Sequence, residues 1–61
     1  MQPPTAREVI KRLENEGWLL IRQKGSHRQY AKGNQCVTVP GNQGDTLTWR
    51  TWSNIKRQAG W

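Results

Sequence analysis

The 61-residue sequence predicts a single α+β domain in the order α-β-β-β-α, in which a three-stranded antiparallel sheet buries one face under two helices. Three observations predict this architecture. A segment with apolar residues at helical spacing comes first, three short segments rich in strand formers follow between glycine-containing turns, and a second segment with helical spacing comes last. A chain of this length has room for one small domain, assigned to residues 1–61, and a two-domain enzyme is excluded.

Residues 5–16 are predicted to form the first helix. Thr5 and Glu8 have the spacing of a capping box, in which each side chain accepts a hydrogen bond from the backbone of the other residue. Gly17 can supply the left-handed residue that ends the helix. The apolar positions of one helical face are Val9, Ile10 and Leu13.

Three strands are predicted over residues 18–24, 27–32 and 35–39. The turn between the first two is Gly25-Ser26, and the turn before the third is Gly33-Asn34. Because side chains alternate along a strand, Val37 and Val39 share one face of the third strand, and Cys36 and Thr38 share the other.

The second helix is predicted from Thr48 onward. Pro40 ends the third strand, and the composition of residues 41–44 favours a flexible loop without regular structure. Gly60 is a plausible C-terminal cap. Helical spacing is kept by Trp52, Ile55 and Ala59.

The charge balance points to a polyanionic partner. Ten Lys and Arg residues stand against four Asp and Glu residues, which gives a net charge of +6 in a chain that is only 33% hydrophobic. Four Trp residues place most of the large apolar surface in a few bulky side chains, so a compact core is feasible despite the low hydrophobic fraction.

No segment of the sequence predicts a membrane or export. The longest apolar run, residues 18–21, is far shorter than the roughly 20 residues that cross a bilayer, and the first residues lack the apolar core of a signal peptide. Cys36 is the only cysteine, so it cannot form an internal disulfide, and no Cys/His cluster has the spacing of a zinc site. We therefore expect a soluble, cytoplasmic protein with no structural metal and no cofactor.

Several motifs occur along the chain in a specific order. They are Gly17-Trp18, Arg22-Gln-Lys-Gly-Ser-His27, Tyr30, Val37-Thr-Val-Pro40 and Ile55-Lys-Arg-Gln-Ala-Gly60. With these motifs the sequence resembles the HicA-type toxins over nearly its whole length. The resemblance implies a double-stranded-RNA-binding-domain-like fold, mRNA interferase activity, and inhibition by a HicB-type antitoxin. Its most diagnostic part is Gly25-Ser26-His27.

The chain departs from that family pattern at two places. Many HicA-type toxins carry a further His shortly after the Val-Pro pair, whereas Pro40 here is followed by Gly41 and Asn42. Many also read Gly-Thr-Leu at the start of the last helix, where this chain has Arg50-Thr51-Trp52. Trp52 can still fill the core position, whereas the first departure leaves the chain with a single imidazole.

His27 is the first candidate for catalysis, because an unperturbed imidazole, with a pKa of about 6.5, exchanges protons readily near neutral pH. Metal-free RNA cleavage needs a base for the 2′-hydroxyl proton, donors for the phosphorane charge, and an acid for the departing 5′-oxygen. From composition alone, His27 is better interpreted as a polar strand residue, and the Gly-Ser-His motif favours catalysis instead. One His without a nearby carboxylate pair does not build a Mg²⁺ or Zn²⁺ site.

The predicted RNA path follows the hairpin around His27. Lys24 lies across the turn and is expected to reach the same side as His27, and the backbone amides of Gly25 and Ser26 are candidate phosphate ligands. The basic residues expected to line this path are Arg22, Lys24, Arg28 and Lys32.

The aromatic residues divide into core and surface. Trp18 and Trp52 are predicted to lie in the core, and Tyr30 is predicted to pack because its strand phase is opposite to that of His27. Trp49 and Trp61 are less constrained, and either stacking on RNA bases or packing against an antitoxin fits them.

Three functions fit these observations. The leading interpretation is a metal-independent endoribonuclease toxin that cleaves mRNA with His27. The alternative is a non-catalytic RNA-binding module of the double-stranded-RNA-binding type. In a third interpretation, the chain is a small basic subunit whose real partner is an acidic protein, and its RNA affinity is incidental.

Overall fold

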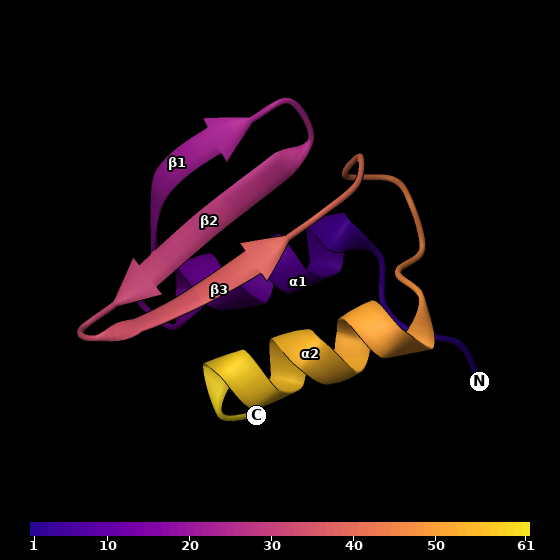
Figure 1. The fold of residues 1–61 in the computed structure, drawn as a ribbon. Coiled ribbons are helices and arrows are strands. Elements are labelled where there is room, and N and C mark those ends of the chain that lie inside the picture. The colour runs from indigo at the N-terminus through magenta and orange to yellow at the C-terminus, as the bar shows by residue number, and fades with distance from the viewer.

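A computed structural model describes all 61 residues and has the predicted order of elements (Figure 1). The elements are α1 Ala6–Asn15, β1 Leu19–Lys24, β2 His27–Lys32, β3 Gln35–Val39 and α2 Trp49–Ala59. The predicted bounds differ from these only at the ends, because Thr5 and Glu16 cap α1 and Trp18 precedes β1. Neither helix is long and apolar enough to span a bilayer.

The predicted capping box starts α1. The Thr5 hydroxyl accepts a hydrogen bond from the Glu8 backbone N–H at 3.2 Å, and the Glu8 carboxylate accepts one from the Thr5 backbone N–H at 3.1 Å. These bonds satisfy N–H groups that a helix start otherwise leaves unpaired, a contribution of about 1 kcal/mol. Gly17 follows the helix with a φ of 90°, the left-handed conformation that the sequence predicted.

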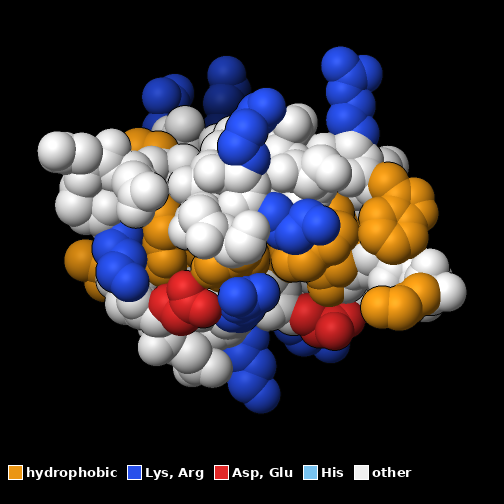
Figure 2. Space-filling view, turned by 90° about the horizontal axis from the view of Figure 1, so that it is seen from below, with side chains coloured by type: hydrophobic (Ala, Val, Ile, Leu, Met, Phe, Trp, Pro, Cys, Tyr) orange, Lys and Arg blue, Asp and Glu red, His pale blue; other side chains and the backbone are white.

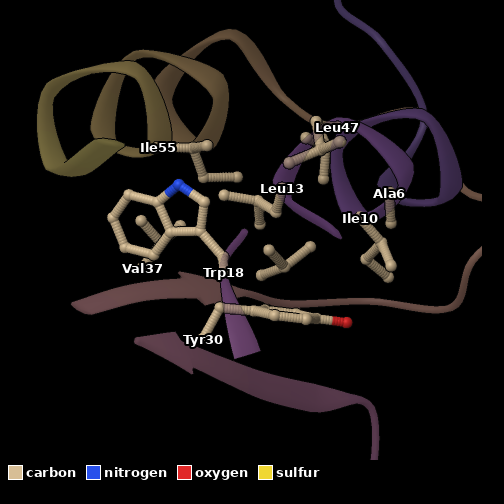
Figure 3. Close-up of a cluster of buried hydrophobic side chains, with 10 residues drawn as sticks. Ala6, Ile10, Leu13, Trp18, Tyr30, Val37, Leu47 and Ile55 are labelled. Atoms are coloured by element: carbon tan, nitrogen blue, oxygen red, sulfur yellow. The ribbon is translucent and has the colours of Figure 1, made fainter. Parts of the chain in front are cut away.

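The three strands form one antiparallel sheet in the order β1-β2-β3, and both helices cover the same face of it (Figure 1). α2 packs mainly against β3, which α1 also contacts. All six residues of β1 are exposed, so β1 adds nothing to the core. The buried core between sheet and helices consists of Ala6, Val9, Ile10, Leu13, Trp18, Tyr30, Val37, Val39, Leu47 and Ile55 (Figure 3).

The loop after β3 is tied to the start of α1. It has no helix and contributes one isolated antiparallel bridge, between Thr46 and Thr5. Its carbonyl groups accept hydrogen bonds from the first turn of α1, at 3.0 Å between the Ala6 N–H and the Asp45 carbonyl and at 2.8 Å between the Arg7 N–H and the Gln43 carbonyl. The loop therefore supplies partners for backbone N–H groups that the capping box leaves open.

The second helix is capped at both ends and secures the far edge of the sheet. The Thr48 hydroxyl accepts a hydrogen bond from the Thr51 N–H at 3.1 Å, and Gly60 ends the helix with a φ of 75°. The Gln58 side-chain carbonyl accepts a hydrogen bond from the Thr38 backbone N–H at 3.1 Å. Since β3 is an edge strand, this bond occupies a backbone donor that no neighbouring strand can pair.

Trp61 is held more firmly than the sequence predicted. Its indole N–H donates to the Glu16 carboxylate at 2.8 Å, and the Arg12 guanidinium stacks 3.9 Å from its ring centroid. Its ring also lies 6.1 Å, centroid to centroid, from that of Trp52, which is half-buried against the core. These contacts join the last turn of α1 to the chain that follows α2. Only Trp49, whose side chain is 59% exposed, remains as unconstrained as predicted.

The Glu16 contacts predict an acid-dependent loss of stability. The hydrogen bond from Trp61 and then that from Arg12 lower the pKa of Glu16 below its ordinary value of 4.5. A carboxyl with a lowered pKa stabilises the folded state above its unfolded pKa, and this contribution disappears as the pH falls through the folded pKa. Between about pH 6 and about pH 3, we expect wild-type protein to lose more thermal stability than Glu16→Gln. Glu14→Gln is the matched control and should follow the wild type; equal losses in all three proteins would contradict the assignment.

Candidate nucleic-acid interface

The face of the sheet opposite the helices carries the candidate site. Tyr30, Val37 and Val39 point into the core, so the residues between them in each strand point outward. His27 and Thr38 therefore project from the open face of the sheet, and the His27 side chain is exposed. The strands thus place the candidate chemistry on one face and the packing on the other.

The register of the sheet brings several polar side chains together on this open face. Lys24 is paired with His27 across the β1–β2 ladder, Arg22 is paired with Gln29, and Gln29 is paired in turn with Thr38 on β3. Paired residues on one face of an antiparallel sheet lie about 5 Å apart at their Cβ atoms. These five side chains line a shallow hollow of about 220 Å³.

A β-bulge puts the two basic residues of β1 on this face. The pairing shifts by one residue between Leu20 and Arg22, so that Ile21 has no partner on β2. Without this extra residue, Arg22 and Lys24 would share a face with the buried Trp18, because each lies an even number of positions along the strand from Trp18. The bulge reverses the alternation and turns both cations toward the His27 side of the sheet.

The turn between β1 and β2 holds His27 at the start of its strand. Gly25 has a φ of 59°, a conformation that L side chains rarely adopt and that two-residue hairpin turns require at their first position. The carbonyl of Gly25 accepts a hydrogen bond from the Gln23 side chain at 3.1 Å, and that of Ser26 accepts one from Arg28 at 3.4 Å. A Cβ built at Gly25 meets nothing within 4 Å, so the backbone there is open to a ligand.

Two of the four predicted basic residues lie outside the hollow. Arg28 is on the helix side of β2, where its guanidinium donates to the carbonyls of Ser26 at 3.4 Å and Gly41 at 3.3 Å. Its position connects the hairpin turn to the loop after β3. Lys32 lies at the far end of β2, paired with Gln35. Of the predicted set, Arg22 and Lys24 are the cations that the sheet places beside His27.

Two residues that the sequence analysis did not select also line the hollow. Gln29 is two residues from His27 on the same strand, and Thr38 is paired with Gln29 on β3. The alternation of side chains along β2 and β3 predicts that both residues share a face with His27. Each adds hydrogen-bonding capacity beside an imidazole, from a side-chain amide and from a hydroxyl.

A larger hollow, of about 570 Å³, lies on the helical side of the molecule. It is bordered by residues 1–4, by Glu8, Val9 and Arg12 of α1, and by Trp52 and Trp61. Figure 2 shows this side of the molecule, where hydrophobic side chains lie among Lys and Arg and acidic side chains. It contains no imidazole, so the candidate chemistry belongs to the smaller hollow on the sheet.

The fold and the site define a small, basic α-β-β-β-α protein with a single His beside two cations on the open face of its sheet. A family model described as the HicA toxin of bacterial toxin–antitoxin systems matches residues 6–61. The chain belongs to the HicA toxin family, and it is therefore a toxin of a toxin–antitoxin system. A comparison with curated proteins finds no match. The membership confirms the resemblance noted in the sequence.

Proposed function

We propose that this toxin is a metal-independent endoribonuclease that cleaves mRNA with His27 as its general acid–base group. In the proposed reaction, the His27 imidazole takes the proton of a ribose 2′-hydroxyl. The 2′-oxygen then bonds to the adjacent phosphorus while the bond from phosphorus to the 5′-oxygen breaks. The products are a 2′,3′-cyclic phosphate and a 5′-hydroxyl, whose proton comes from the imidazolium or from water.

The observation that carries this proposal is the pairing of Lys24 with His27 on the open face of the sheet. A phosphate bound by Lys24 and Arg22 lies within reach of an imidazole on the next strand. The same cations offset the negative charge that develops on the phosphorane. Gln29 and Thr38 are in place to donate further hydrogen bonds to phosphate or ribose oxygens.

The donor set of the hollow supports chemistry without a metal. Its lining consists of cationic and neutral side chains and includes no carboxylate. Mg²⁺ and Ca²⁺ are bound through oxygen ligands in which carboxylates are prominent, and a Zn²⁺ site needs several His, Cys or carboxylate ligands. A hollow with two cations and one imidazole suits a phosphate better than a divalent cation.

We further infer that the toxin acts in the cytoplasm, where mRNA is available, and that a HicB-type antitoxin inhibits it. Membership of a toxin–antitoxin family supports an antitoxin partner. The net charge of +6 favours a partner with an acidic surface. Covering the exposed His27 and the two cations beside it is the simplest route to inhibition.

The test is to incubate purified protein with a long single-stranded RNA in excess EDTA and to analyse the ends of the products. Cleavage that leaves 2′,3′-cyclic phosphate and 5′-hydroxyl ends supports the proposal. Cleavage only after Mg²⁺ is added, or 5′-phosphate products, would contradict it. RNA binding without cleavage would favour the alternative, a non-catalytic RNA-binding module. The observation in favour of that alternative is the single imidazole in the hollow, with no second acid.

Replacing Lys24 by alanine should weaken RNA binding in a salt-dependent way. One lost phosphate contact on a single strand lowers the slope of log K against log salt concentration by about 0.7. Lys11→Ala is the matched control, because it removes the same charge from an exposed position on α1, a helix on the other side of the sheet. Fluorescence anisotropy at several salt concentrations measures both slopes. If Lys24→Ala binds like Lys11→Ala at every salt concentration, Lys24 does not contact the RNA.

A further inference from the structure

β1 exposes three consecutive aliphatic side chains. Leu19 is 70% exposed, Leu20 is 48% exposed and Ile21 is 58% exposed. Single exposed aliphatic residues are common on soluble proteins, whereas a hydrophobic edge strand is an interaction surface or an aggregation hazard. In a small chain with a hydrophobic fraction of only 33%, these three side chains are a notable share of the aliphatic residues left outside the core. We call Leu19–Ile21 the aliphatic run.

The backbone beside the aliphatic run is also unpartnered. β1 pairs only with β2, so its other edge presents backbone N–H and C=O groups to which no strand is bonded. The opposite edge of the sheet has partners within the chain. α2 packs against β3, and Gln58 of α2 accepts a hydrogen bond from the Thr38 N–H. One edge of the sheet is therefore covered from within the chain, and the β1 edge is left open.

The positive charge of β1 indicates which kind of segment can pair with this edge. Arg22 and Lys24 follow the aliphatic run on the same strand, in a chain with a net charge of +6. A second copy of the chain would bring two strongly basic surfaces together, and the bulge at Ile21 further hinders regular pairing between two β1 strands. A strand with aliphatic and acidic side chains meets both requirements, because opposite charges across paired strands are stabilising.

We propose that the antitoxin docks by adding an extended segment to the β1 edge as a fourth strand of the sheet. Backbone hydrogen bonds supply the pairing, the aliphatic run supplies the apolar contact, and acidic side chains of the segment face Arg22 and Lys24. Because these two cations also line the hollow beside His27, the added strand blocks the RNA site from its edge. The inference rests on the proposed function only in taking the antitoxin as the partner.

The test compares two variants for binding to the purified HicB-type antitoxin. Leu19→Thr combined with Ile21→Thr places β-branched residues, which favour a strand, at both positions and removes apolar contact area. We expect this double variant to lose affinity for the antitoxin at least about tenfold by titration calorimetry. Asn54→Thr is the control, because it replaces an exposed, uncharged side chain on α2, away from β1. In the absence of antitoxin, both variants should cleave RNA as the wild type does.

Hydrogen exchange then separates strand addition from side-chain contact alone. We expect exchange of outward-facing β1 amides to slow when the antitoxin binds, with smaller changes in the turn after β2. Equal affinities for the double variant and the control would overturn the proposal, as would slowed exchange confined to other elements. Slowed β1 exchange in concentrated toxin alone would identify a second copy as the occupant and also overturn it. If wild-type toxin cleaves RNA but fails to bind the antitoxin, the docking inference fails and the nuclease proposal stands.

Discussion

Replacing His27 by alanine should reduce the rate of RNA cleavage by about 10²- to 10⁴-fold, the usual contribution of a positioned general acid–base group. RNA binding should change little, because the cations in the hollow, Arg22 and Lys24, remain. The fold should also be unaffected, since His27 is exposed and lies outside the core cluster. Single-turnover cleavage and RNA affinity, measured on the same preparations, separate the two effects.

The His27→Gln variant separates proton transfer from hydrogen bonding at this position. Glutamine keeps a polar side chain of similar reach but cannot take up a proton near neutral pH. It should therefore be as inactive as His27→Ala if the imidazole transfers a proton. Activity retained by His27→Gln would show that a hydrogen bond at this position is sufficient, and that proton transfer belongs to another group. A parallel loss of cleavage and RNA binding in both variants would make His27 a binding residue.

The elements of the fold could be predicted because their signals are local. The capping box of Thr5 and Glu8, the glycine turns and the alternation in β3 each depend on residues a few positions apart. Trp61 is different, since its position depends on Glu16 and Arg12, which lie more than forty residues earlier in the chain. No local pattern predicts a contact of that separation, so the sequence left Trp61 unconstrained.

The bulge in β1 follows from two requirements that the sequence places on this strand. The core requires Trp18 to point inward, and the two-residue turn pairs Lys24 with His27, whose face is opposite to that of Tyr30. Trp18 and Lys24 are six residues apart and would share a face in a regular strand. The two requirements agree only if one residue is inserted between them, and the structure places this extra residue at Ile21.

Two of the predicted RNA-binding residues were selected by nearness in sequence rather than by face. Arg28 is adjacent to His27 on β2, and adjacent residues on a strand point to opposite faces, which places Arg28 toward the loop after β3. Lys32 is five residues from His27, and five residues of strand span about 17 Å. Gln29 and Thr38 lie on the same face of the sheet as His27 and close to it, and they therefore line the hollow.

The same strand that presents His27 to solvent also carries a fully buried aromatic residue. Tyr30 is 2% exposed, and its ring lies between the sheet and the helices (Figure 3). Burial raises the pKa of its phenol, because the charged form is disfavoured away from water. The proposed catalytic residue and the buried aromatic residue therefore lie on opposite faces of β2. Substituting His27 should lower the cleavage rate without changing the stability, whereas substituting Tyr30 should lower the stability.

Tyr30→Ala should remove a large share of the protein's stability and melt far below the wild type. Truncating a large buried aromatic side chain costs about 3 to 5 kcal/mol. A domain of this size has a total stability of only about 3 to 9 kcal/mol. Tyr30→Phe is the matched control and should stay folded, since it retains the ring that packs in the core. Thermal unfolding followed by circular dichroism measures the difference. A Tyr30→Ala protein that melts near the wild-type temperature would show that the sheet tolerates a cavity under β2. His27→Ala, in contrast, should melt at the wild-type temperature and lose only cleavage.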